Sequence, residues 1–132
     1  LGMAHTAFAD EEVLELESLE DPAQVCARFY EYWTLKEAFA KALQLPLTYA
    51  LVRCCFAGTA AAVAARLPIS QPWRAVVYAP RAQLRLAVVS VGEHADSWSS
   101  QPLTVEWPPR REATWSVVRS LESAGIGSQA PC

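Results

Sequence analysis

The residues best suited to chemistry lie close together between positions 33 and 41. Trp33, Glu37 and Lys41 are spaced four residues apart, so a helix would place them on one face, and Lys36 would lie beside Glu37. Lysine ammonium groups bind phosphate oxygens, and a carboxylate can hold Mg²⁺, which prefers oxygen ligands. The spacing therefore suits a polyphosphate with a divalent cation, but taken alone it favours a solvated Glu37–Lys41 pair with an exposed Lys36.

A longer pattern around these residues separates the two interpretations. The string Trp33-Thr34-Leu35-Lys36-Glu37-Ala38, followed by Lys41-Ala42, resembles the W-x-x-K-E-A-x-x-K-A signature of 4'-phosphopantetheinyl transferases. With tryptophan at its head, it is closest to the broad-specificity type that activates the surfactin and enterobactin synthetases. Phe8 and Glu12 also resemble the F-S-x-x-E element that precedes the signature in this family, with Ala9 in place of serine. The resemblance covers residues 8 to 90 and indicates the C-terminal half of such an enzyme.

The resemblance implies an activity and a role for each matching residue. Enzymes of this family transfer the 4'-phosphopantetheine arm of coenzyme A to a serine of an acyl or peptidyl carrier protein, with magnesium. Glu37 would be a magnesium ligand and would help to deprotonate the carrier serine, and Lys36 and Lys41 would contact the phosphates of coenzyme A. Glu37 and Lys41 are accordingly the expected catalytic residues. Trp33, a large aromatic residue on a buried helix, is expected to pack and not to react.

One part of the family pattern is missing from the sequence. In enzymes of this type two similar halves enclose coenzyme A, and further magnesium ligands come from a G-x-D-x-E segment upstream of the phenylalanine element. That segment is absent, so we expect either an incomplete part of a longer enzyme or a degenerate protein that keeps the scaffold. A second half-domain, in cis or in trans, would complete the site. The alternative is a non-catalytic half-domain that acts as an interaction or dimerisation module.

The elements that must position these residues are a long helix and several strands. Asp21 and Pro22 form a strong helix start, because aspartate caps a helix and proline suits its first position, and the apolar pattern predicts a helix to about Leu43. The resemblance implies an α+β fold in which this long helix packs on a small antiparallel sheet. We also expect an acidic helix over residues 10–20 and strands over residues 48–56, 73–78 and 84–91. The alanines of residues 60–67 favour a helix, but the position between two strand-like runs leads us to expect a strand.

The last third of the chain differs in composition from the rest. Beyond Gly92 the sequence becomes rich in serine, proline, tryptophan and arginine, which predicts an extended or partly disordered tail. We therefore divide the chain into a half-domain over residues 1–91 and a tail over residues 92–132, in which residues 112–123 could form one helix.

Composition argues against several other classes of protein. A net charge of −3 gives no basic surface for nucleic acid, and no apolar run is long enough to cross a bilayer. The four cysteines lack the paired spacing of a zinc site, so we expect buried free thiols. His5 and His94 are expected at the surface. These features indicate a cytoplasmic protein without membrane or nucleic-acid partners.

Overall fold

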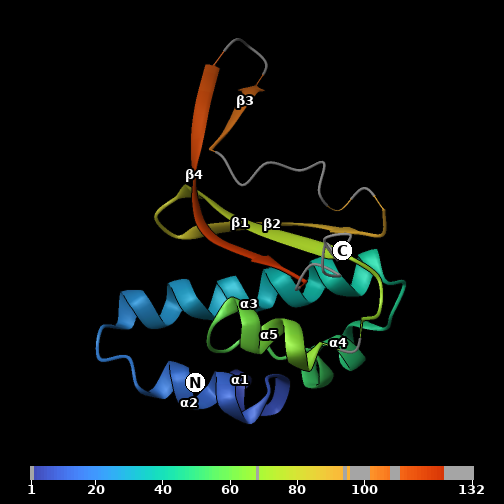
Figure 1. Cartoon of the computed structure of the whole chain (residues 1–132). Helices are drawn as coiled ribbons and strands as arrows, with labels where there is room; N and C mark the ends of the chain where they lie inside the picture. The colour runs from blue at the N-terminus through green and yellow to red at the C-terminus, as the bar shows by residue number, and fades with distance from the viewer. Residues whose placement is uncertain (1, 68, 94, 96–101, 108–110, 124–132) are drawn as a thin grey trace, which may run out of the picture.

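The computed structural model describes residues 2–67, 69–93, 95, 102–107 and 111–123. Among these residues the helices come first and the strands follow (Figure 1). The helices are α1 Gly2–Ala7, α2 Asp10–Glu17, α3 Pro22–Ala42, α4 Leu47–Arg53 and α5 Ala60–Arg66, and the strands are β1 Trp73–Arg81, β2 Leu84–Val91, β3 Leu103–Trp107 and β4 Arg111–Glu122. The strands form one antiparallel sheet in the order β2-β1-β4-β3. The predicted α+β fold, a long helix packed on a small antiparallel sheet, is confirmed.

Helix α3 begins where the sequence predicts. The Asp21 carboxylate accepts a hydrogen bond of 2.9 Å from the Ala23 backbone N–H, and a proline occupies the first turn. The helix ends without the glycine that usually takes the left-handed position after a helix. Gln44 takes that position instead, at φ 55°, and the Leu45 N–H donates to the Ala40 carbonyl at 2.8 Å. The acidic helix expected over residues 10–20 is present as α2.

Strands β1 and β2 form the hairpin that the two β-prone runs predict. Trp73 lies opposite Val91, and Tyr78 lies opposite Leu86. Successive side chains of a strand point to opposite faces, so alternate residues of each strand reach the helices. The residues of this face that belong to the core or pack against it are Trp73, Ala75 and Val77 of β1 and Ala87, Val89 and Val91 of β2.

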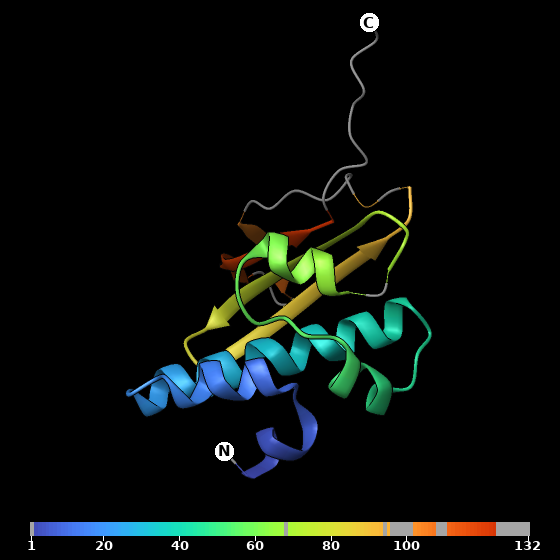
Figure 2. The same cartoon turned by 60° about the horizontal axis from the view of Figure 1, so that its bottom comes forward.

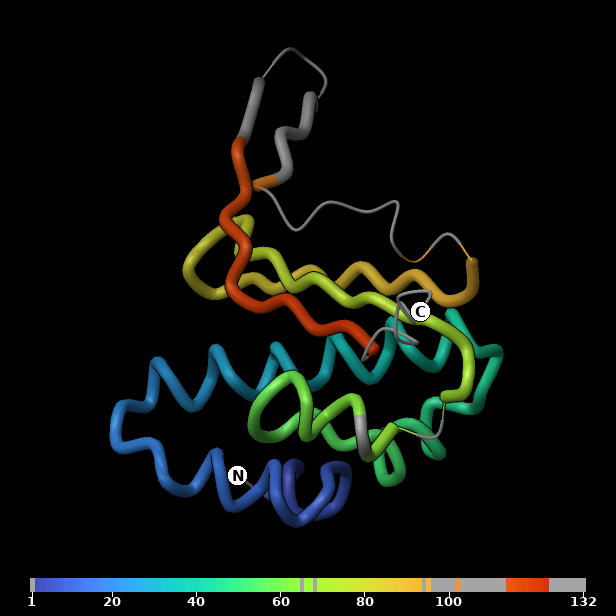
Figure 3. The backbone as a smooth tube through the Cα atoms, viewed as in Figure 1, coloured from blue at the N-terminus to red at the C-terminus, as the bar shows by residue number. Residues whose placement is uncertain are grey.

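Strand β4 occupies the segment where a helix was expected over residues 112–123, so that prediction is wrong. It pairs with β1 on the side away from β2 (Figure 3). In this pairing Glu122 lies opposite Arg74, and Leu121 lies opposite Ala75. Exposure alternates along residues 114–121 and ends on the buried Leu121. This is the pattern of a strand with one face on a core. The segment that we set apart as a tail thus contributes an inner strand to the sheet.

Two short helices stand where strands were expected between α3 and β1. The strand expected over residues 48–56 is wrong, because residues 47–53 form α4 and only the stretch after it is extended. The strand expected over residues 60–67 is also wrong. Helix α5 begins after Thr59, whose hydroxyl accepts a hydrogen bond from the Ala62 N–H at 3.3 Å. The helix propensity of the alanines prevails there over the position between strand-like runs.

The elements form a sheet with helices packed on one of its faces. Helix α3 packs on β2 and β1, and α5 packs on β4 on the same side of the sheet (Figures 1 and 2). Helices α2 and α4 contact α3 on the side turned away from the sheet (Figure 1). Helix α3 therefore has neighbours on two sides. Its buried residues include Leu35 and Phe39, and the Phe39 ring meets Trp73 of β1 edge to face, with centroids 5.3 Å apart.

Candidate functional site

Lys36 is directed into the interior of the protein. Its side chain is 0% exposed, as is that of Glu12 on α2, and one Glu12 carboxylate oxygen lies 2.8 Å from the Lys36 ammonium nitrogen. The ammonium also donates to two backbone carbonyls at the C-terminal end of α4, those of Leu51, at 2.7 Å, and Cys54. Three oxygen atoms thus occupy the three N–H donors of one buried ammonium group.

Glu12 is bound by the backbone as well as by Lys36. Its carboxylate accepts hydrogen bonds from the N–H groups of Ala9, at 3.0 Å, and Phe56, at 2.9 Å. Burial raises the pKa of the Glu12 carboxyl, and Lys36 and these N–H groups oppose the rise. The bond from Ala9 lies at the start of α2, so Glu12 satisfies a donor there although Ala9 offers no capping side chain. The Lys36–Glu12 pair therefore connects α2, α3, the end of α4 and the segment that follows it.

Lys36 and Glu37 point to different sides of α3. Consecutive residues of a helix are turned by about 100°, so burial of Lys36 brings Glu37 toward the open face. Glu37 is partly exposed and Lys41, one turn later, is exposed. Among the described residues neither side chain has a hydrogen-bond or ion-pair partner, and the two do not form the pair that their spacing allows. Trp33 stacks on Phe29, with ring centroids 6.3 Å apart and planes 13° from parallel.

The open face of α3 offers one carboxylate for a metal ion, that of Glu37. In the described part of the chain no group of three or more histidine, cysteine, aspartate or glutamate side chains is arranged to hold a metal. Mg²⁺ usually keeps several waters and binds one or two protein carboxylates together with substrate phosphates. Glu37 therefore fits as one ligand of a magnesium ion, but not as a complete site.

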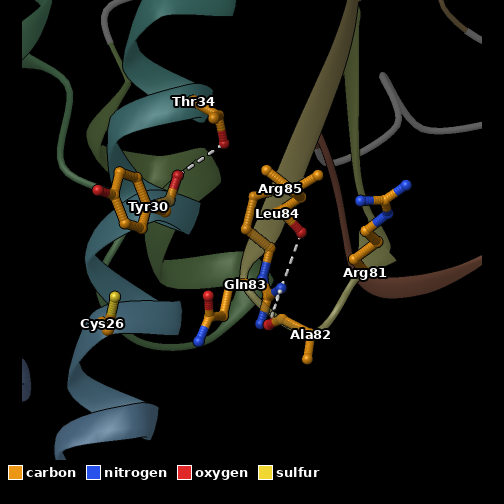
Figure 4. A pocket seen from close by; sticks show the side chains of 8 residues that line it. All are labelled: Cys26, Tyr30, Thr34, Arg81, Ala82, Gln83, Leu84 and Arg85. Atoms are coloured by element: carbon orange, nitrogen blue, oxygen red, sulfur yellow. Dashed lines mark hydrogen bonds between the residues drawn. The ribbon is translucent and has the colours of Figure 1, made fainter.

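A groove adjoins this face at the tip of the β1–β2 hairpin. It has a volume of about 760 Å³ and lies between Cys26, Tyr30 and Thr34 of α3 and Gln83, Leu84 and Arg85 of the hairpin (Figure 4). The Arg85 guanidinium folds back over the turn and donates to the carbonyls of Ala82, at 3.1 Å, and Leu84, at 2.9 Å. Thr34 precedes Glu37 by three residues, so the groove and Glu37 share one face of the helix.

The geometry can be compared with known families at this point. A model of the 4'-phosphopantetheinyl transferase superfamily matches residues 1–89, a range that contains the buried pair, Glu37 and Lys41. The chain belongs to this superfamily. Neither a curated protein nor a solved structure matches it. Membership makes the chain a transferase domain of the kind that transfers phosphopantetheine. The matched region ends within β2, so β3 and β4 of this transferase domain lie beyond it.

The contact between Lys36 and Glu12 is the feature of this region that sequence reasoning missed. Both residues belong to the motifs that carry the family resemblance, but each motif was interpreted alone. The Phe8 ring centroid also lies 5.3 Å from the Lys36 ammonium. Both matching residues of the phenylalanine element therefore contact the first lysine of the signature. Considering the two motifs together, the second of them on a helix predicted to be buried, could have indicated this pair.

Two of the described cysteines of the transferase domain, Cys54 and Cys55, do not form a reactive centre. Cys54 and Cys55 are buried and free, as predicted, and burial raises the pKa of both thiols. They stay protonated at neutral pH and are poor nucleophiles. Cys26 is free but exposed, so the expectation of a buried thiol is wrong at that position. Cys132 lies outside the described residues.

Two further expectations concern the surface and the membrane. His5 is exposed, as predicted, and its Nε2 lies 3.2 Å from a Glu17 carboxylate oxygen. His94 lies outside the described residues. In the part of the chain that the structure describes, no helix has the length and apolar character needed to span a bilayer.

Proposed function

We propose that this chain takes part in transferring the 4'-phosphopantetheine arm of coenzyme A to a serine of an acyl or peptidyl carrier protein, with magnesium. The observation that carries the proposal is the open face of α3. There Glu37 and Lys41 stand one turn apart, both without a partner among the described residues. A carboxylate and an ammonium left free beside each other suit a metal–phosphate ligand, and the superfamily match supports the reaction. We further propose the broad-specificity type and its C-terminal half.

In the proposed reaction the carrier serine oxygen attacks the β-phosphorus of coenzyme A. A bond between that phosphorus and the serine oxygen forms, the bond to the bridging oxygen breaks, and adenosine 3',5'-bisphosphate leaves. Glu37 accepts the serine proton and provides one oxygen ligand for magnesium, which when bound neutralises charge on the diphosphate. Lys41 binds a phosphate oxygen and holds the diphosphate against the open face.

Lys36 receives a different role from the one expected. Its three donors are engaged inside the protein, so the phosphate contact expected of it falls to Lys41 in this proposal. We propose that Lys36 is a positioning residue, which fixes the rotation of α3 about its axis and thereby keeps Glu37 and Lys41 on the open face.

The proposed site needs a second contributor. Glu37 supplies one protein ligand, and a magnesium ion held between protein and diphosphate would bind more firmly with further protein ligands. We therefore propose that a second half-domain, in cis or in trans, supplies them. The alternative is a non-catalytic half-domain whose open α3 face binds another half-domain without chemistry. The unpartnered surface of α3 is consistent with both the transferase and the non-catalytic half-domain. Only the transferase requires coenzyme A.

The test is calorimetric titration of coenzyme A into the folded chain, with and without magnesium. We expect magnesium-dependent binding that Glu37→Gln and Lys41→Ala each weaken at least about tenfold, the loss typical of one charged contact. Glu20→Gln and Arg53→Ala are the matched controls, because both residues are exposed and lie on other parts of the chain. They should bind like the wild type.

Two results would count against the proposal. Equal binding by the wild type and both site variants would remove Glu37 and Lys41 from the site. Absence of binding by a chain that circular dichroism shows to be folded would contradict the expectation that the open face of α3 binds coenzyme A by itself. Self-association of such a chain in sedimentation analysis would then favour the interaction module, and a monomer would mean that coenzyme A binding requires the second half-domain.

A further inference from the structure

The hairpin groove carries positive charge that nothing in the described chain neutralises. Arg85 lies in the groove, and Arg81 extends from its rim on the side away from α3 (Figure 4). No acidic side chain lines the groove, and neither arginine has a carboxylate partner among the described residues. Four arginines on other elements do have such partners: Arg28, Arg66, Arg74 and Arg119 each pair with a glutamate.

Arg85 also has a donor left over. Its guanidinium Nη1 donates to the two turn carbonyls, but its Nε is buried and has no hydrogen-bond partner in the described part of the chain. Buried donors are normally satisfied. An anionic group that enters the groove beside the hairpin turn would meet a guanidinium that is only partly engaged.

Apolar side chains flank this charge. Tyr30 is 45% exposed and Leu84 is 52% exposed, on opposite sides of the groove. Tyrosine and arginine are the residue types enriched at protein interfaces, where an apolar centre is surrounded by polar groups. A small-molecule pocket would instead enclose most of its ligand. A groove between a helix and an exposed hairpin tip therefore suits a segment of another protein, and the charge requires that segment to be acidic.

We infer that the groove is the docking surface for an acidic segment of the carrier protein, an inference that rests on the proposed function. Thr34, on the wall of the groove, precedes Glu37 by three residues, or about 4.5 Å along the helix axis. A carrier seated between Tyr30 and the hairpin would approach Glu37 along the open face of α3. Its carboxylates would pair with Arg81 and Arg85, and its apolar side chains would cover Tyr30 and Leu84.

The experiment measures binding of the full chain to two probes, an apo acyl carrier protein and an apo peptidyl carrier protein, each with its acceptor serine replaced by alanine. We expect one probe to bind, with an affinity that falls as salt is added and falls at least about tenfold in Arg81→Glu and in Leu84→Asp. Arg53→Glu is the matched control. Arg53 is exposed on α4 and, like Arg81, has no acidic partner among the described residues. Thermal unfolding of each variant verifies that it is folded.

Coenzyme A titration of the same variants separates this inference from the proposed function. If the hairpin variants lose the carrier but keep coenzyme A, the docking surface is supported. If the wild type binds a carrier through the hairpin but does not bind coenzyme A, the surface stands and the proposed function falls. The inference is overturned if neither probe binds the wild type, if Arg53→Glu weakens binding as much as Arg81→Glu, or if the hairpin variants lose coenzyme A and keep the carrier.

Discussion

Lys36 and Glu37 are neighbours in the signature, yet Lys36 is buried in the core and Glu37 is partly exposed. Taking an ammonium and a carboxylate out of water is costly, and their attraction offsets that cost only when further hydrogen bonds complete both groups. Here the Lys36 ammonium has two carbonyl partners and the Glu12 carboxylate has two N–H partners in addition to each other. Such a pair defines one rotation of α3, because any turn of the helix about its axis would leave a buried charge without partners.

Replacing Lys36 by methionine should leave the Glu12 carboxyl buried without its cation and lower the free energy of unfolding by about 3–5 kcal/mol. Urea denaturation measures this change. Glu37→Gln, one position along but on the open face, is the control and should alter stability by less than about 0.5 kcal/mol. The double variant Lys36→Met with Glu12→Gln should recover part of the loss, because no buried charge remains. Equal losses in Lys36→Met and Glu37→Gln would contradict the structural role.

The same variant should respond to pH with a definite sign. Burial raises the Glu12 pKa above its ordinary value of 4.5, so the folded protein holds this proton more tightly than the unfolded chain. A group of this kind contributes stability below pH 4.5 and loses that contribution as the pH rises through the folded-state pKa. Without Lys36 the folded-state pKa rises further. The stability deficit of Lys36→Met against the wild type should therefore widen from about pH 4 to pH 7, and a constant deficit would mean that Glu12 does not titrate with folding.

At the scale of elements, local signals predicted the acidic helix α2, the helix α3 with its clear start signal, and the hairpin of β-branched residues. Helix α4 escaped prediction because its sequence is rich in β-prone residues and its end is stabilised from a distance. The Lys36 ammonium, which lies well before α4 in the chain, donates to the Leu51 and Cys54 carbonyls at the C-terminal end of that helix. No window along the sequence contains both the helix and its distant donor, so local propensity could not reveal it.

The end of α3 offers a stability test that leaves the site intact. Gln44 occupies the left-handed region at φ 55°, which is unfavourable for a residue with a Cβ atom and costs glycine nothing. Gln44→Gly should therefore raise the free energy of unfolding by about 0.5–1 kcal/mol. Gln24→Gly, the same chemical change in the first turn of α3, should lower it by a similar amount. Denaturation of both variants measures the two signs, and destabilisation by Gln44→Gly would mean that the glutamine side chain makes a contribution larger than the strain.

At the scale of the whole molecule, the sheet includes β4, which lies beyond the residues that the family model matches. Trp115, Val117 and Leu121 stand at alternate positions in the sequence, but the proline- and serine-rich composition around them favoured a tail. This segment is a strand because it pairs with β1, a contact between segments far apart in the chain. Arg119 also connects β4 to the helical layer: its guanidinium lies 3.0 Å from a Glu31 carboxylate oxygen on α3 and donates to the Phe56 carbonyl at 2.6 Å.

Ending the chain after Val91 should therefore prevent stable folding. The truncation exposes one edge of β1, removes the buried Leu121, worth about 1.5–3 kcal/mol, and leaves Glu31 in the interior without Arg119. These losses approach the whole stability of a typical domain, about 5–15 kcal/mol. A chain ended after Ser123 keeps every described strand and is the matched control. Circular dichroism with thermal unfolding should show a cooperative transition for the control and none for the shorter chain, whereas a cooperative transition in both would mean that residues 1–91 fold as an independent half-domain.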